Sequence, residues 1–151
     1  MILDSGNRRE FDTGAVRDIE EGKGRCDLMP LYVASRMFVK ETGDLDYVLM
    51  WLNSFMKNNV APPLFTALDY FIEKAYSNDY PTALLEVSKH FEEGAKKYGE
   101  NNWQKGIPVN CYIDSATRHY LKWLRGDKDE DHARAFVWNV MCCIFEVERH
   151  D

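Results

Sequence analysis

The sequence predicts an all-α protein, folded as a single compact helical domain of about five to six helices behind an irregular N-terminal segment. Apolar residues recur at helical spacing through most of the chain after Pro30, and no segment alternates apolar with polar residues as a strand would. Hydrophobic residues make up 45% of the 151 residues, which is enough for the core of one domain. We expect residues 1–29 to form the irregular, Gly- and charge-rich segment and residues 30–151 to form the helical domain.

Turn-forming residues mark where the expected helices begin and end. Asn58-Asn59 and Pro62-Pro63 interrupt the helical spacing, as do the loop at 99–108 and the acidic stretch at 126–130. The expected helices cover residues 31–38, 47–55, 64–76, 81–98, 111–125 and 130–148. Such helices pack through their apolar stripes, so polar residues at the margins of these stripes are the candidates for function.

Charge and composition exclude several classes of protein. With 25 acidic and 19 basic residues the net charge is −6, which argues against a broad surface for a nucleic-acid polymer or an anionic membrane. The longest apolar stretch, residues 135–145, is shorter than the roughly 20 residues that span a bilayer, and the N-terminus carries no export segment. The four cysteines form no C-x-x-C pair, and Cys142 and Cys143 are expected to act as small hydrophobes without a disulfide. We therefore expect a cytoplasmic protein.

One carboxylate stands out on the expected helix at 81–98. At 100° per residue, Glu92 falls at the margin of an apolar stripe that includes Leu84, whereas Glu93 points away from that stripe. A carboxylate at a core margin needs a partner, because burying it alone is costly. Glu92 is therefore a candidate functional residue, and Glu93 is expected on a solvated face.

The expected helix at 111–125 carries three polar candidates beside its apolar face. Asp114 and Arg118 share one flank at the spacing of an ordinary surface ion pair, which is the simplest interpretation of these two residues. His119 lies on the other flank. It is either a hydrogen-bonded structural histidine or a ligand-binding or catalytic residue.

The last expected helix is strongly apolar, yet His132 and Asn139 lie on one stripe, seven residues apart. A buried amide without a partner costs about 1–3 kcal/mol, so Asn139 is expected to bond either another helix or a ligand. Asp131 precedes this stripe, and an acid in the first turn of a helix also interacts favourably with the helix dipole.

Two candidates lie outside the expected helices. The segment Gly22-Lys23-Gly24-Arg25 places two cations among glycines, which allow the backbone to approach a phosphate closely. It lacks the spacing of a Walker A loop, and a charged surface turn is the alternative. Trp103 follows Asn101-Asn102 in the expected loop, where it either stacks on a base or covers the core.

These candidates belong to a set of motifs that runs through most of the chain. The set comprises Thr13-Gly14-Ala15, Arg17, Gly22-Lys23-Gly24-Arg25 with Asp27-Leu28 and Pro30, Glu92 to Gly99, Asn102-Trp103, Asp114, Arg118-His119, and His132 to Asn139. From about Arg9 to Glu148 the chain resembles a domain family common in bacteriophage genomes. That family is described as the N-terminal domain of dATP/dGTP diphosphohydrolase and is associated with MazG-like pyrophosphohydrolases.

The resemblance implies hydrolysis of a purine deoxynucleoside triphosphate to its monophosphate and pyrophosphate. MazG-like enzymes are all-α, are usually oligomeric, and hold magnesium with carboxylates from two helices, so a homo-oligomer with Mg²⁺ is expected in the cytoplasm of a bacterial host. The resemblance gives three groups of site residues: metal ligands Glu92, Asp114 and Asp131; catalytic Glu92, His119 and His132; and substrate-binding Lys23, Arg25, Lys96, Trp103, Arg118 and Asn139.

The sequence departs from the MazG-like pattern at its acidic motifs. Three residues after Glu86 comes Lys89, and three residues after Glu93 comes Lys96, so neither position completes an E-x-x-E pair. One or two carboxylates among several cations suit a phosphate-bearing ligand better than two metal ions. The alternative function is therefore a non-catalytic phage protein that binds and sequesters a nucleotide or a cyclic-nucleotide immune signal. A purely structural role does not explain the clustered polar residues.

Overall fold

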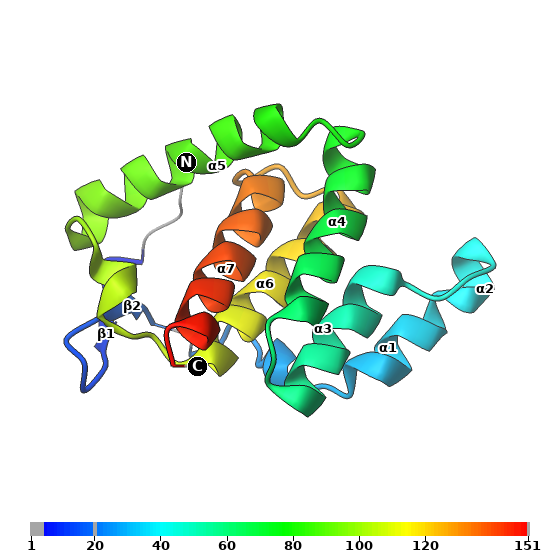
Figure 1. Cartoon of the computed structure of the whole chain (residues 1–151), viewed down its shortest axis with the longest axis horizontal. Coiled ribbons are helices and arrows are strands. Elements are labelled where there is room, and N and C mark those ends of the chain that lie inside the picture. The colour runs from blue at the N-terminus through cyan, green and yellow to red at the C-terminus, as the bar shows by residue number, and fades with distance from the viewer. Residues whose placement is uncertain (1–4, 20, 151) are drawn as a thin grey trace.

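The computed structural model describes residues 5–19 and 21–150, and it confirms the α-helical fold class. The outer ends of the two predicted segments, at residues 1–4 and 151, lie outside the described part, as does residue 20. The helices, labelled in Figure 1, are α1 Leu31–Met37, α2 Val39–Thr42, α3 Tyr47–Asn58, α4 Pro62–Tyr76, α5 Tyr80–Tyr98, α6 Val109–Arg125 and α7 His132–Glu148. Short 3₁₀ turns lie at Cys26–Leu28 and Asn102–Lys105.

The helix boundaries follow from capping residues. The side chains of Asp46, Asp79 and Asp131 each accept a hydrogen bond from a backbone N–H in the first turn of α3, α5 and α7. Asn59 and Gly126 adopt left-handed backbone conformations directly after α3 and α6, which ends those helices. These residue types explain why the helices could be placed from the sequence to within a few residues.

The N-terminal segment contains a small sheet, which corrects the expectation that the chain has no strand. Strand β1, Arg8–Glu10, pairs antiparallel with β2, Val16–Asp18. Three-residue strands are too short to show alternation. A contact far along the chain supports them, because the Asn102 side chain accepts from the Val16 N–H and donates to the Val16 carbonyl, both at 2.8 Å.

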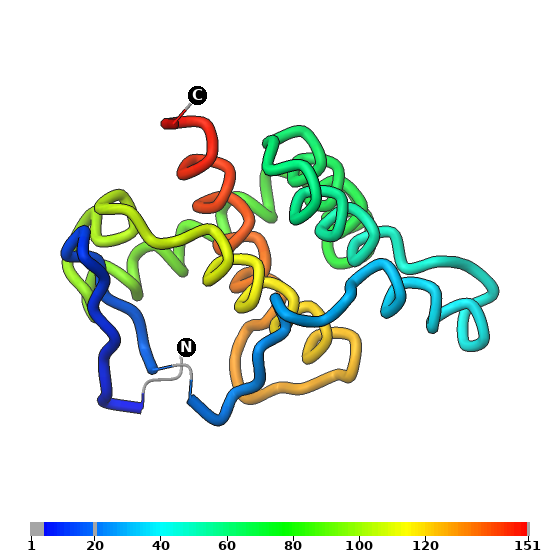
Figure 2. The backbone as a smooth tube through the Cα atoms, turned by 90° about the horizontal axis from the view of Figure 1, so that it is seen from below, coloured from blue at the N-terminus to red at the C-terminus, as the bar shows by residue number. Residues whose placement is uncertain are grey.

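The turn of this hairpin packs against the loop at 99–108. Thr13 Oγ1 donates to the Gly106 carbonyl at 2.6 Å, and Ala15 is fully buried. Gly106 has a φ of 111°, and a Cβ at that position would lie 3.0 Å from the Thr13 side chain. Glycine is therefore required there on both conformational and steric grounds. Figures 1 and 2 show the hairpin beside the C-terminal end of α5 and this loop.

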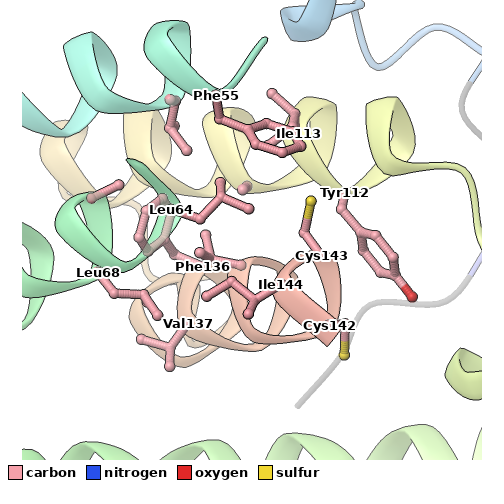
Figure 3. Close-up of a cluster of buried hydrophobic side chains, with 14 of the residues drawn as sticks. Phe55, Leu64, Leu68, Tyr112, Ile113, Phe136, Val137, Cys142, Cys143 and Ile144 are labelled. Atoms are coloured by element: carbon pink, nitrogen blue, oxygen red, sulfur yellow. The ribbon is translucent and has the colours of Figure 1, made fainter. Parts of the chain in front are cut away.

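The hydrophobic core lies where α6 and α7 pack against each other and against α3 and α4. Figure 3 shows Phe55, Leu64, Ile113 and Phe136 meeting in this core. All four cysteines are free thiols, as predicted, and Cys142 and Cys143 are buried among apolar side chains. Burial raises the pKa of the Cys143 thiol to about 12, so this thiol stays protonated and acts as a hydrophobic group. Within the described residues, no helix is long and apolar enough to cross a bilayer.

Candidate functional site

A cavity of about 720 Å³ lies between the N-terminal hairpin, α5, the loop at 99–108, one face of α6, and α7. This volume falls in the range of about 300–1,000 Å³ that is typical of small-molecule sites. Aromatic side chains line part of the wall: Phe91, Tyr98, Trp103 and Trp138. The lining also carries five basic side chains and four acidic ones: Arg9, Arg17, Lys23, Arg118 and Lys122, and Asp18, Glu100, Asp114 and Glu130. The cavity therefore combines a surface for a planar group with a surface for an anion.

Arg17 on β2 is the best-placed of these cations. Its Nη2 donates to Asn139 Oδ1 at 3.3 Å, and its guanidinium carbon lies 5.4 Å from the centre of the Tyr112 ring. Its Nη1 is buried and has no hydrogen-bond partner among residues 5–19 and 21–150. The Arg17 side chain is half-buried and lines the cavity, so a small movement would bring this donor, which has no carboxylate partner among the described residues, to whatever fills the cavity.

Two further buried polar atoms on this wall lack partners within the described part of the chain: His90 Nδ1 and Trp138 Nε1. The two rings lie against each other, with centroids 5.3 Å apart. Burial, with a smaller contribution from Arg134, lowers the pKa of His90 to about 4, so this imidazole is neutral near pH 7. Unpartnered buried atoms also occur outside the lining, for example on Trp51 and Thr117. Arg17, His90 and Trp138 differ from these residues because all three line the same cavity.

The segment Gly22-Lys23-Gly24-Arg25, called here the basic Gly loop, is held against α6 by the Asp114–Arg118 pair. Arg118 Nη2 donates to Asp114 Oδ2 at 2.6 Å and to the Gly24 carbonyl at 2.8 Å. Asp114 Oδ1 accepts from the Cys26 N–H at 2.6 Å. The pair is therefore more than a surface ion pair, because it fixes the loop that carries Lys23 to the cavity wall.

Two histidines meet beside the cavity. His119 Nδ1 lies 2.9 Å from His132 Nδ1, and His132 Nε2 lies 2.6 Å from Asp129 Oδ1. His119 and Glu130 line the cavity, whereas His132 is buried behind them. Burial holds the pKa of His119 well below its usual value, and the neighbouring His132 contributes in the same direction. The His119 imidazole is therefore neutral. Burial also raises the pKa of Glu130.

The structure brings together six of the predicted site residues on the cavity wall: Lys23, Trp103, Asp114, Arg118, His119 and Asn139. His132 lies in contact with His119. Asn139 does not make the predicted bond to another helix within the described residues: its amide donates to the Ala135 carbonyl of its own helix, and its oxygen accepts from Arg17 on β2. Trp103 packs edge-on against Phe91, with ring centroids 5.5 Å apart, and still lines the cavity.

Four predicted site residues do not face the cavity. Glu92 and Lys96 lie on the exposed face of α5. Arg25 forms a forked pair with both oxygens of Asp27, at 2.8 Å each, and Asp131 caps α7. The three carboxylates predicted to hold Mg²⁺ (Glu92, Asp114 and Asp131) therefore do not converge, and Asp114 is already bonded to Arg118. This residue set does not fit a single magnesium site.

The error on α5 has a simple geometric origin. The predicted apolar stripe included Leu84, which is 51% exposed, whereas the side of the helix that faces inward carries Ala83, Val87 and His90. This rotation turns Glu92 out to solvent. It also turns Glu93 inward, where its carboxylate accepts from Arg134 Nη2 at 2.5 Å.

Several lining residues were not identified as site residues from the sequence: Arg17, His90, Lys122, Glu130 and Trp138. A signal existed for Lys122, because it follows Asp114 and Arg118 at four-residue spacing on α6. His119 was predicted on the flank of α6 opposite Asp114 and Arg118. All three residues line the same cavity. Arg17 reaches the site through a contact 122 residues away in the chain, which no local pattern reveals.

Comparison with protein families gives one match. The model of the family described as "dATP/dGTP diphosphohydrolase, N-terminal" matches residues 65–151, which is more than half of the chain. The matched region contains α5, α6 and α7, which supply much of the cavity wall, whereas the hairpin with Arg17 precedes it. No curated protein and no solved structure matches the chain. The chain belongs to the family of dATP/dGTP diphosphohydrolase N-terminal domains.

Proposed function

We propose that the cavity binds a purine deoxynucleotide. The observation that carries this proposal is the set of three unpartnered buried polar atoms on one wall: Arg17 Nη1, His90 Nδ1 and Trp138 Nε1. Leaving a buried donor or acceptor unsatisfied costs about 1–3 kcal/mol each, so three such atoms on side chains that line one cavity favour an occupant that they reach after a small movement.

The basic side chains on the cavity lining suit the phosphates. Arg17 Nη1 has no hydrogen-bond partner among the described residues, and Lys122 lies on the same lining. Lys23 is held nearby, with its ammonium 3.1 Å from Asp18 Oδ2. Charge-assisted hydrogen bonds from such groups to phosphate oxygens are shorter and stronger than those between neutral groups. The protein is acidic overall, and a local cluster of cations in it favours the binding of an anion at this place.

The aromatic rings on the cavity lining suit the base. Phe91, Trp103 and Trp138 lie on the lining, and their rings contact one another edge-on or tilted, with centroids 5.5 Å apart for Phe91–Trp103 and 5.9 Å for Phe91–Trp138. Base–aromatic stacking contributes about 1–3 kcal/mol for each base. The choice of a purine deoxynucleotide among nucleotides comes from the family description.

A second candidate function is Mg²⁺-dependent hydrolysis of dATP or dGTP to the monophosphate and pyrophosphate, which the same family description favours. We favour nucleotide binding over hydrolysis as the proposed function, because the three predicted magnesium ligands lie apart. Sequestration of a cyclic-nucleotide signal would use the same cations and aromatic rings. A homo-oligomeric state, a bacteriophage origin and a cytoplasmic location stay predictions.

Calorimetry and chromatography together test the proposal. We expect dGTP or dATP to bind saturably in the presence of EDTA and to be recovered unchanged, with cyclic dinucleotides as competitors for the same site. Arg17→Met should raise the Kd by about 10- to 100-fold, because it removes a charge-assisted contact. Arg36→Met, on an exposed part of α1, is the matched control and should bind as the wild type does.

Two outcomes would change the conclusion. Release of pyrophosphate upon addition of Mg²⁺ would make the second candidate the function. Absence of binding by every nucleotide, with or without Mg²⁺, would contradict both candidates.

A further inference from the structure

Three potential metal ligands converge at the edge of the cavity. His119, Glu130 and His132 each offer one ligand atom, and these atoms lie within 4.8 Å of one another. They come from the C-terminal half of α6, the loop that follows it, and the first residue of α7. The group contains none of the three carboxylates that the family resemblance gave as metal ligands, and its two histidines were predicted as catalytic residues.

The hydrogen bonds of His132 fix which nitrogen faces this group. Its Nε2 lies 2.6 Å from Asp129 Oδ1, so the ring proton resides on Nε2 and is donated to that carboxylate. The lone pair on Nδ1 then points toward His119. Metal-binding histidines characteristically donate their second ring N–H to a carboxylate, which orients the ring and makes the ligand nitrogen more basic. Asp129 is the carboxylate that accepts this N–H of His132.

The separation of the two imidazoles is close to that of a metal site. Two nitrogens at about 2.05 Å from a tetrahedral ion lie about 3.3 Å apart. His119 Nδ1 and His132 Nδ1 lie 2.9 Å apart, so an opening of a few tenths of an ångström would admit an ion. Binding would also move the His119 proton from Nδ1 to Nε2, a change of tautomer without a change of charge.

The type of ligand selects the type of ion. Two neutral imidazoles and one carboxylate suit zinc and other divalent first-row transition metals, whereas magnesium prefers oxygen ligands throughout. The Glu130 carboxylate, partly removed from water, would gain a cationic partner. A second group, Asp127 and Asp129 with His132, also lies within reach of an ion. It would use the Asp129 carboxylate that already orients His132, so we favour the first group.

We propose that His119, His132 and Glu130 bind one divalent transition-metal ion of the zinc type, with a coordination position open to the cavity. His119 and Glu130 both line that cavity, so a water molecule or a phosphate oxygen could occupy the open position. This inference goes beyond nucleotide binding and does not depend on it, because the three ligands come from the protein alone.

Cobalt substitution tests the proposal without any nucleotide. Protein stripped with EDTA is titrated with Co²⁺, and the visible d–d absorption of the ion is followed. We expect one Co²⁺ per chain, with the absorption intensity of a four-coordinate site, and displacement of Co²⁺ by Zn²⁺. Absence of binding, or a spectrum identical to that of aqueous Co²⁺, would overturn the proposal.

Variants then locate the ion. His119→Ala and Glu130→Gln should each abolish or strongly weaken Co²⁺ binding, whereas Asp129→Asn should weaken it by about 10- to 100-fold through the orientation of His132. His150→Ala is the matched control, because His150 lies outside the group and contacts Glu146. Circular dichroism confirms that each variant is folded. Unchanged Co²⁺ affinity in both folded His119→Ala and folded Glu130→Gln would place the ion elsewhere and overturn the assignment.

Discussion

Two polar clusters, one around Asp46 and Tyr120 and one around Arg17, His90 and Trp138, differ in how completely the protein satisfies them. In the first, Asp46 accepts from the Leu49 N–H at 2.9 Å and from Tyr120 Oη at 2.5 Å, while Lys74 Nζ reaches the Tyr120 hydroxyl at 2.8 Å. In the second, on the cavity wall, Arg17, His90 and Trp138 each keep a buried polar atom without a partner in the described residues. The first cluster holds α3, α4 and α6 together, whereas the second has polar atoms that we propose a bound nucleotide would satisfy.

The largest expected effect concerns the first cluster. Asp46→Ala removes the cap of α3 and leaves the buried Tyr120 hydroxyl without its acceptor, so we expect a loss of about 3 kcal/mol in the free energy of unfolding. Urea denaturation measures this loss. Asp79→Ala removes an exposed cap at the start of α5 and should cost much less. Equal losses in the two variants would show that the Asp46 network adds nothing beyond helix capping.

The next effect concerns pH and the second cluster. Because the pKa of His90 is lowered from 6.5 to about 4 in the folded protein, the unfolded chain binds a proton first as the pH falls. Stability is therefore independent of this group above its unfolded pKa and decreases through the window down to about 4. The loss should reach about 2 kcal/mol near pH 5.

The control for this pH effect is His90→Gln, which lacks the titrating group. The difference in unfolding free energy between the wild type and this variant should shrink or reverse as the pH falls from near neutral. Parallel pH profiles for the two proteins would mean that His90 remains accessible to protons in the folded state.

A pair of conservative variants compares the two clusters directly. Tyr120→Phe deletes a hydroxyl that donates to Asp46 and should lower the free energy of unfolding by about 1–2 kcal/mol. Arg17→Met removes one long hydrogen bond to Asn139 while its other guanidinium nitrogen is unpartnered among the described residues, and it should lower the free energy of unfolding by about 1 kcal/mol in the absence of a nucleotide. A large loss of stability for Arg17→Met would show that this side chain serves the fold.

The same contrast explains how much the sequence could predict. Local signals placed the helices: an aspartate caps α3, α5 and α7, and Gly126 ends α6. The two strands were not predicted, because the residue that supports them, Asn102, lies far along the chain. On α5 the exposed Leu84 was predicted as a core residue, so the predicted buried face was rotated from the real one. Glu92 was therefore expected at the core margin and is exposed, whereas Glu93 was expected in solvent and is partly buried.

The site was predictable where its residues share a helix face and, for Lys23 and Trp103, where local composition marked a loop. Asp114, Arg118 and His119 lie on α6 within two turns, and the polar residues His132 and Asn139 stood out on the apolar α7. Arg17 and His90 enter the site through the hairpin and through the orientation of α5. These placements depend on tertiary packing, so helical periodicity carried no information about them.

The most direct test of the central claim follows the Trp138 indole N–H by NMR, with its resonance assigned through Trp138→Phe. When dGTP is added to metal-free protein, we predict that this resonance moves and saturates as the cavity fills, because the indole gains a partner. The resonance of Trp51 on α3, outside the cavity, should stay in place. An unchanged Trp138 resonance at a dGTP concentration that saturates binding would contradict the claim that this cavity is the nucleotide site.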